Sequence, residues 1–161
     1  MAVYVLDTNV LVAGSGDSSM SPQCQLEALR FLLKLRRSSD RVAVDHLDLI
    51  LRQYRNNLNQ SPNQQSPGFE LYKVLQSEGR FDYCQIDIDE VGTPILPEAC
   101  LIHDPSDRVF IAVALIHEEN PPIYNVSDED WIEDELRLRD CKIVINHICE
   151  GELRAKVKAK L

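Results

Sequence analysis

The stretch VYVLDTNVLV, residues 3–12, decides the fold. Its first four residues form a short apolar run, which is typical of a strand buried on both faces of a parallel sheet. The run stops at Asp7, and Thr8 and Asn9 follow before apolar residues resume. Because ligands of an open parallel sheet bind at the carboxyl ends of its strands, an acid at this position indicates a functional site.

Helical and strand patterns alternate along the rest of the chain. Apolar residues recur with helical spacing over 23–37, 46–58, 69–79, 105–119 and 127–140. Strand-like runs cover 41–45, 121–126 and 141–148, and 81–89 is either an edge strand or an extended lead. This alternation predicts an α/β fold, a three-layer α/β/α sandwich with a mostly parallel central sheet. We expect a single domain over 1–150 and a basic C-terminal tail over 151–161 that forms a frayed helix.

Composition narrows the class of protein. A chain of 161 residues is about one domain, and its net charge of −9 argues against a passive nucleic-acid binder, which would be basic. An enzyme that holds cations in an acidic cleft is compatible with that charge. The sequence has no run of about 18 apolar residues, so we expect no membrane span. No basic region precedes the first strand, so we expect no signal peptide. Five cysteines without a CxxC pair predict reduced thiols in a cytoplasmic protein.

Acidic residues gather at one edge of the predicted sheet. They end two strands, open a helix and follow a third strand; they are Asp7, Asp45, Asp104, Asp107 and Asp128. Carboxylates that lie this close repel each other, and a divalent cation relieves the repulsion. Hard oxygen ligands suit Mg²⁺ or Mn²⁺, so the pattern predicts a site for one of these ions.

Helix capping is the alternative for several of these acids taken singly. Asp104 precedes a proline as an N-cap residue does, and Asp107 then falls in the first helical turn, where acids favour the helix dipole. Asp45 is placed to cap the helix after the second strand. For Asp7 the alternative is a simple turn from strand to helix.

Four motifs resemble those of the PIN-domain nucleases, in particular the bacterial, toxin-type members. They are VYVLDTNVLVAG, DPSDRVFIAVAL, IYNVSDEDW and CKIVINHICEGE, and together they cover nearly the whole chain. The resemblance implies a PIN-like α/β/α fold and metal-dependent cleavage of RNA. It implies Asp7, Asp107 and Asp128 as the catalytic metal ligands, with Asp104 as an auxiliary acid. Asn9 and Ser127 are candidates to hydrogen-bond the ligating carboxylates.

One position departs from the family's pattern. PIN nucleases carry a glutamate on the helix after the second strand, and the matching residue here is Gln53. On that helix Asp48 lies on the opposite flank of the apolar stripe, so it does not replace the missing acid. Gln53 could coordinate through its amide oxygen or hold a water, but it adds no charge and is a poor general base. The departure favours one tightly held ion and a weak second one.

Two classes of function stay open. The first is a metal-dependent endoribonuclease, with the resemblance adding a toxin role, an antitoxin partner and a homodimer. The second is a degenerate PIN module that binds RNA or protein without cutting; a phosphatase or a flap-type DNA nuclease would share the metal chemistry. For an RNA substrate, Arg52, Arg55 and Arg108 are the candidate phosphate contacts. Trp131, just after the last acid, is expected only to pack.

Overall fold

The computed structural model describes residues 1–60, 65–102 and 104–161 and contains one five-stranded sheet. The strands are β1 (Val3–Leu6), β2 (Arg41–Asp45), β3 (Phe81–Cys84), β4 (Ile123–Asn125) and β5 (Ile145–His147). Every strand pairing is parallel, and the order across the sheet is β3-β2-β1-β4-β5. The predicted mostly parallel sheet is confirmed.

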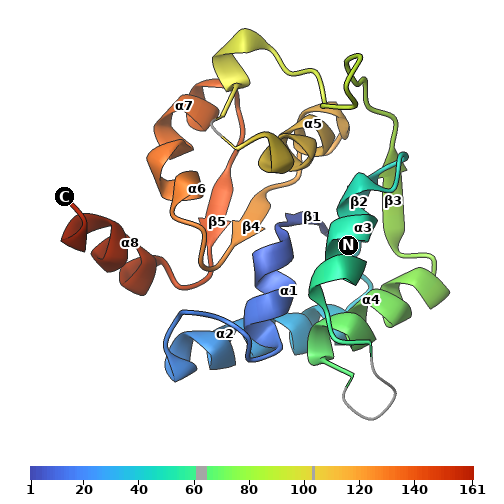
Figure 1. The fold of residues 1–161 in the computed structure, drawn as a ribbon. Coiled ribbons are helices and arrows are strands. Elements are labelled where there is room, and N and C mark those ends of the chain that lie inside the picture. Colours follow the sequence, from blue (N-terminus) through green and yellow to red (C-terminus); the bar gives the residue numbers. More distant parts are fainter. Residues whose placement is uncertain (61–64, 103) are drawn as a thin grey trace.

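Helices cover both faces of the sheet. They are α1 (Thr8–Gly14), α2 (Pro22–Arg37), α3 (Leu49–Asn57), α4 (Pro67–Ser77), α5 (Arg108–Ile116), α6 (Asp130–Glu133), α7 (Glu135–Asp140) and α8 (Glu150–Ala159), with short 3₁₀ turns η1 (Glu98–Cys100) and η2 (Pro105–Asp107). In Figure 1, α1, α2 and α4 lie below the strands, and α5 and α7 lie above them. The predicted three-layer α/β/α sandwich is confirmed, and it is consistent with the PIN-like fold that the resemblance implies.

The first strand lies at the centre of this sheet. Val5 and Leu6 have no exposed surface, as the apolar run predicts. On one side β1 pairs with β2, and on the other side with β4, where Val5 lies opposite Ile123. The strand order therefore reverses between β1 and β4. Such a switch point opens a crevice at the carboxyl ends of the two strands, and Asp7 lies at that position.

Helix α5 packs on the sheet and begins directly after Asp107, the last residue of η2. Six of its nine residues are buried, and it packs against β1, β2 and β4. Because α5 runs antiparallel to the strands, its N-terminal end lies at their carboxyl edge. The η2 turn joins α5 there, so Asp107 reaches the same edge as Asp7. Across the described ranges, no helix combines the length and the apolar character needed to cross a membrane.

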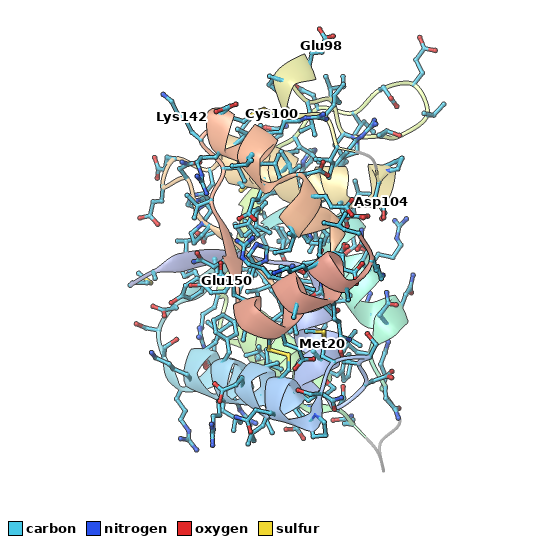
Figure 2. All side chains as sticks on the ribbon, turned by 90° about the vertical axis from the view of Figure 1, so that its left-hand side faces the viewer. Met20, Glu98, Cys100, Asp104, Lys142 and Glu150 are labelled. Atoms are coloured by element: carbon cyan, nitrogen blue, oxygen red, sulfur yellow. A yellow bond between two sulfur atoms is a disulfide. The ribbon has the colours of Figure 1, made fainter. Side chains whose placement is uncertain are left out.

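The segment expected as a frayed tail, 151–161, belongs mostly to a docked helix. Helix α8 buries Leu153 completely, and the Ser21 backbone N–H donates to Glu152 Oε2 at 2.8 Å. Figure 2 shows α8 at the front of the molecule, with the labelled Glu150 at its start. These contacts tie the C-terminal segment to the start of α2.

The prediction of reduced thiols is wrong for four of the five cysteines. Disulfides join Cys24 to Cys149 and Cys100 to Cys141, and Cys84 is free and buried. The paired residues are 125 and 41 positions apart, so local spacing could not reveal them. Folding brings α8 against α2 and α7 against η1, and that contact creates the pairs.

We expect the close approach of α4 to α1 to be sensitive to one methyl group. A Cβ at Gly68 would lie 2.7 Å from the Leu11 carbonyl oxygen and 2.8 Å from Ser15 Oγ. Gly68→Ala should therefore lower the free energy of unfolding by about 1–3 kcal/mol, measured by urea denaturation. Gly151→Ala is the matched control, because Gly151 lies in α8 with open space around it and should gain up to about 1 kcal/mol. Equal effects of the two substitutions would contradict this packing.

Candidate metal centre

Three acids from distant parts of the chain meet at the carboxyl edge of β1 and β4. Asp7 ends β1, Asp107 ends η2, and Asp128 follows β4. One carboxylate oxygen of each lies within 4.8 Å of the others. Asp7 and Asp107 are buried and Asp128 is half-buried. The structure thus brings together the three acids that the sequence singled out as metal ligands.

Asp7 is held by two N–H donors. Its Oδ1 accepts from the Asn9 backbone N–H at 2.9 Å, because the chain turns directly from β1 into α1. Its Oδ2 accepts from the indole Nε1 of Trp131 at 2.7 Å. Trp131 is 1% exposed, so it packs as expected, and it also orients the carboxylate. Nothing in the local sequence indicated this second role of Trp131, because it depends on a contact across 124 residues.

Burial and mutual repulsion make these carboxylates hard to ionise together. Burial raises the pKa of Asp107 to about 9, and the charges of Asp7 and Asp128 add to the effect. Burial also raises the pKa of Asp7 to about 6, against the two N–H donors that favour its charged form. The pKa of Asp128 is raised as well, first by burial. A divalent cation would oppose these shifts, because its positive charge favours the ionised form of all three carboxylates.

The donor set fits a hard divalent ion. No ion pair joins Asp7, Asp107 or Asp128 to any lysine, arginine or histidine that the structure describes. Buried acids are ordinarily paired with cations or coordinate metals. Three carboxylates also leave positions for water and a phosphate oxygen, as Mg²⁺ requires. The three residues therefore have the chemistry and the spacing to hold Mg²⁺ or Mn²⁺.

A second acidic group adjoins the first and shares Asp107. Asp104, Asp107 and Asp130 also place one carboxylate oxygen each within 4.8 Å of the others. The capping alternative holds for Asp104, whose Oδ1 accepts from the Ser106 backbone N–H at 2.9 Å. The site analysis of the sequence missed Asp130. Its signal was weak, because a run of acids after a strand equally suits the first turn of a helix.

Asp45 lies at the same edge but has a structural role. It has no exposed surface, and its carboxylate accepts from the backbone N–H groups of Leu47, Leu49 and Ile50 at 2.9–3.0 Å. The chain turns through Asp48, whose φ is +66°, before α3 begins. The capping alternative therefore holds for Asp45, and it does not join the metal-binding group.

Gln53 links two elements beside the metal centre. Its Oε1 accepts from Thr8 Oγ1 at 3.1 Å, and its Nε2 donates to the Ser106 carbonyl oxygen at 3.0 Å. Thr8 follows Asp7 and Ser106 precedes Asp107, so Gln53 sets the distance between α1 and η2. A glutamate could accept from Thr8 but could not donate to the Ser106 carbonyl.

Asn9 hydrogen-bonds the carboxylate of Asp7 as predicted, through its backbone N–H at 2.9 Å, and its side chain supports the site in a second way. Its side chain does not bond a ligating carboxylate; its Oδ1 accepts from the Val126 N–H at 2.8 Å and its Nδ2 donates to Asn125 Oδ1 at 2.9 Å. It thereby holds the turn that follows β4. The predicted hydrogen bond of Ser127 to a ligating carboxylate is wrong, since its N–H donates to Asn9 Oδ1 at 3.4 Å and its hydroxyl forms no hydrogen bond with any described residue.

Asn125 is a positioning residue that sequence reasoning missed. It has no exposed surface, its Nδ2 donates to the Asp128 carbonyl oxygen at 2.9 Å, and its Oδ1 accepts from the Asp128 N–H at 3.1 Å. Its Nδ2 also lies 3.1 Å from Nδ1 of His147 at the end of β5. The side chain of Asn125 therefore fixes the backbone on which Asp128 sits. A polar residue inside an apolar strand was the available signal.

The three candidate arginines differ in whether their guanidinium groups are free to bind an RNA phosphate. Arg52 is exposed beside the metal centre. Arg55 is not available as expected, because its guanidinium pairs with both carboxylate oxygens of Asp48 and donates to Tyr72 Oη at 3.0 Å. Arg108 follows Asp107 directly, and its Nε is buried without a hydrogen-bond partner in the described part of the chain.

We expect Asp107→Asn to stabilise the metal-free protein. An acid whose pKa is raised from 3.8 to about 9 binds more protons in the folded state than in the unfolded state across that range. Its contribution to stability therefore falls as pH rises from about 4 to about 9. In EDTA at pH 7, Asp107→Asn should raise the free energy of unfolding by about 1–3 kcal/mol and flatten this pH dependence.

Thermal unfolding with and without Mn²⁺ checks that expectation. Mn²⁺ should raise the melting temperature of the wild type more at pH 8 than at pH 5.5, because protons compete with the ion, and should not stabilise Asp107→Asn. Asp17→Asn, at an exposed acid, is the control and should behave as the wild type. A loss of stability of Asp107→Asn in EDTA would contradict the electrostatic account.

Comparisons of the chain with protein-family models, with curated proteins and with solved structures gave no match. The resemblance to PIN-domain nucleases therefore rests on the four motifs in the sequence. The parallel sheet and the meeting of Asp7, Asp107 and Asp128 are independent of that resemblance. They are observations of geometry, and any function assigned to them is a proposal.

Proposed function

We propose that the protein is a metal-dependent endoribonuclease of the PIN type, which hydrolyses RNA phosphodiester bonds. The observation that carries the proposal is the meeting of Asp7, Asp107 and Asp128 at the switch point of a parallel sheet, without a cationic partner among the described residues. Phosphoryl chemistry on RNA requires charge stabilisation at a site of this kind. The four PIN-like motifs suggest the reaction, and the clustered acids support the proposal.

The chain's own residues would hold and orient the reacting groups. When bound, Mg²⁺ or Mn²⁺ supplies Lewis acidity toward the phosphate and toward the attacking water. Asp7 is fixed in advance by Asn9 and Trp131, and the backbone of Asp128 is fixed by Asn125. This fixed arrangement limits reorganisation during the reaction.

The second acidic group supports a proposal of one strong and one weak ion site. This group shares Asp107 with the first group, and its other two members, Asp104 and Asp130, are less buried than Asp7. Less buried carboxylates bind a cation less tightly because water competes for it. Gln53 adds no charge to either group, and its amide is already bonded at both ends.

That engagement of Gln53 favours the second candidate, a degenerate PIN module that binds RNA or protein without cutting. A family glutamate at this position would bring a fourth negative charge to the centre. Here the amide instead bridges Thr8 and Ser106 as a structural link. A phosphatase or a flap-type DNA nuclease would share the metal chemistry, so the choice of substrate in the assay separates these classes.

The resemblance also shapes the biological part of the proposal. Bacterial PIN proteins of the toxin type suggest an RNA-cleaving toxin with an antitoxin partner, and a homodimer. A cytoplasmic location belongs to the proposal because its substrate is RNA. The argument from reduced thiols no longer supports that location, since four cysteines are paired.

An RNA-cleavage assay tests the proposal. Wild-type protein should cut a mixed-sequence RNA in Mn²⁺ or Mg²⁺ and not in EDTA. Asp7→Asn should reduce the rate by at least about 100-fold, because a ligand that stabilises the transition-state charge is lost. Asp17→Asn should leave the rate unchanged. Cleavage that survives EDTA or Asp7→Asn would contradict the proposal.

Calorimetry with Mn²⁺ separates the enzyme from the binding module. The enzyme requires Mn²⁺ binding that disappears in Asp7→Asn, and Gln53→Glu should tighten it through the added charge. Mn²⁺ binding without cleavage, restored to cleavage in Gln53→Glu, would establish the degenerate module. The absence of Mn²⁺ binding at millimolar ion would exclude both the nuclease and the related metal-dependent hydrolases.

A further inference from the structure

A hollow of about 350 Å³ opens next to the metal centre. Helix α3 forms one side of it, the start of α5 forms another, and the short hairpin around Gly92 closes the rim. Pockets of roughly 300–1,000 Å³ are the size that binds small organic groups in proteins.

Two residues connect this hollow to the metal centre. Gln53 and Ser106 both line the hollow, and a 3.0 Å hydrogen bond joins Gln53 Nε2 to the Ser106 carbonyl oxygen. On its other side, Gln53 accepts from Thr8, next to Asp7, and Ser106 precedes Asp107. A phosphate held at the carboxylates would therefore leave a neighbouring nucleoside beside the hollow.

The lining combines apolar walls with polar groups that have no partner. Leu49, Pro94 and Val109 supply apolar surface for the flat faces of a ring. The side chains of Arg52 and Asn56 form no hydrogen bond or ion pair with any residue in the described ranges. An uncommitted amide reads the polar edge of a base, and an uncommitted guanidinium binds phosphate or stacks on a base.

The rim of the hollow is fixed before any ligand binds. Asp89 Oδ1 accepts from the N–H groups of Val91 and Thr93 at 3.0 and 2.9 Å, and the Asp89 N–H donates to the Thr93 carbonyl at 2.8 Å. Gly92 supplies the positive φ of +85° that this tight turn needs. Thr93 therefore faces α3 from a preformed turn, which reduces the ordering that binding requires.

We infer that this hollow binds an unpaired nucleobase of the strand whose phosphate sits at Asp7, Asp107 and Asp128. The inference rests on the proposed nuclease function and adds to it a base-binding subsite beside the phosphate site. A base stacked and paired in a duplex cannot enter the hollow, because its faces are covered and its polar edge is used.

A larger hollow of about 860 Å³ beside β3 offers a matched control. It lies on the outer strand, two strands away from β1. Three of its polar side chains are committed to one another, since Asp82 pairs with Arg41 and with His117. It also contains an exposed amide, Gln85, so Gln85→Ala removes from this hollow the same chemical group that Asn56→Ala removes from the first.

The test is a binding cycle with two labelled eight-nucleotide single strands, one with bases and one abasic. Fluorescence anisotropy is measured in Ca²⁺, which holds phosphate at an oxygen site, and again in EDTA. The wild type should bind the strand with bases at least about fivefold more tightly than the abasic strand. Asn56→Ala and Thr93→Trp, which fills the hollow, should weaken only the strand with bases; Gln85→Ala should change neither.

The outcomes distinguish this inference from the proposed function. Equal binding of the two strands by the wild type, or equal loss on both in Asn56→Ala, would overturn the base pocket. Tight binding of a blunt RNA duplex would overturn it too. Base discrimination that persists in EDTA, with no effect of Ca²⁺ on affinity, would keep the pocket and count against the metal centre. Mn²⁺ calorimetry on Thr93→Trp should match the wild type, because the hydrogen bonds of Thr93 within the described ranges go to Asp89 and not to a carboxylate of the centre.

Discussion

The repulsion among three crowded carboxylates, two of them buried and one half-buried, is the constraint on which the rest of the site depends. Asp7, Asp107 and Asp128 lie together where water screens their charges poorly, and burial raises the pKa of each. A fold that only had to be stable would replace one of them with a neutral side chain. The molecule instead surrounds them with N–H donors from Asn9 and Trp131, which favour the charged form of Asp7. This is the arrangement expected of residues kept for binding a cation.

The topology of the sheet brings these three carboxylates together. Because the strand order reverses between β1 and β4, their carboxyl ends open into one crevice, and α5 begins beside it. Three segments therefore deliver an acid to the same place by backbone geometry alone. Asn125 then fixes the backbone of Asp128. Gln53 fixes the distance between α1 and η2. The hollow next to Gln53 shares this scaffold, which is why a base pocket and a phosphate site would lie in fixed relation.

The sequence predicted this architecture where local pattern controls structure. The apolar run before Asp7 indicated a buried central strand, and parallel strands share an edge, so the meeting of the three acids followed. The role of Asn125 had a local signal that was overlooked, a polar residue in an apolar strand that bonds Asp128 three residues later. The role of Trp131 could not be predicted, because its contact with Asp7 spans 124 residues. Long separation in the sequence also explains the wrong prediction for the cysteines. Arg55 is not available for the predicted phosphate contact, because Asp48, seven residues earlier, pairs with it. Asp45 was ambiguous in the sequence, and only its three backbone contacts decide between cap and ligand.

The most direct test of the metal centre uses the only tryptophan of the chain, Trp131, whose indole bonds Asp7. Mn²⁺ is paramagnetic and should quench the Trp131 fluorescence when it binds a few ångströms away. The account predicts saturable quenching that Mg²⁺ competes away and that Asp128→Asn abolishes. Weak quenching that rises linearly with Mn²⁺ and is equal in wild type and Asp128→Asn would contradict it.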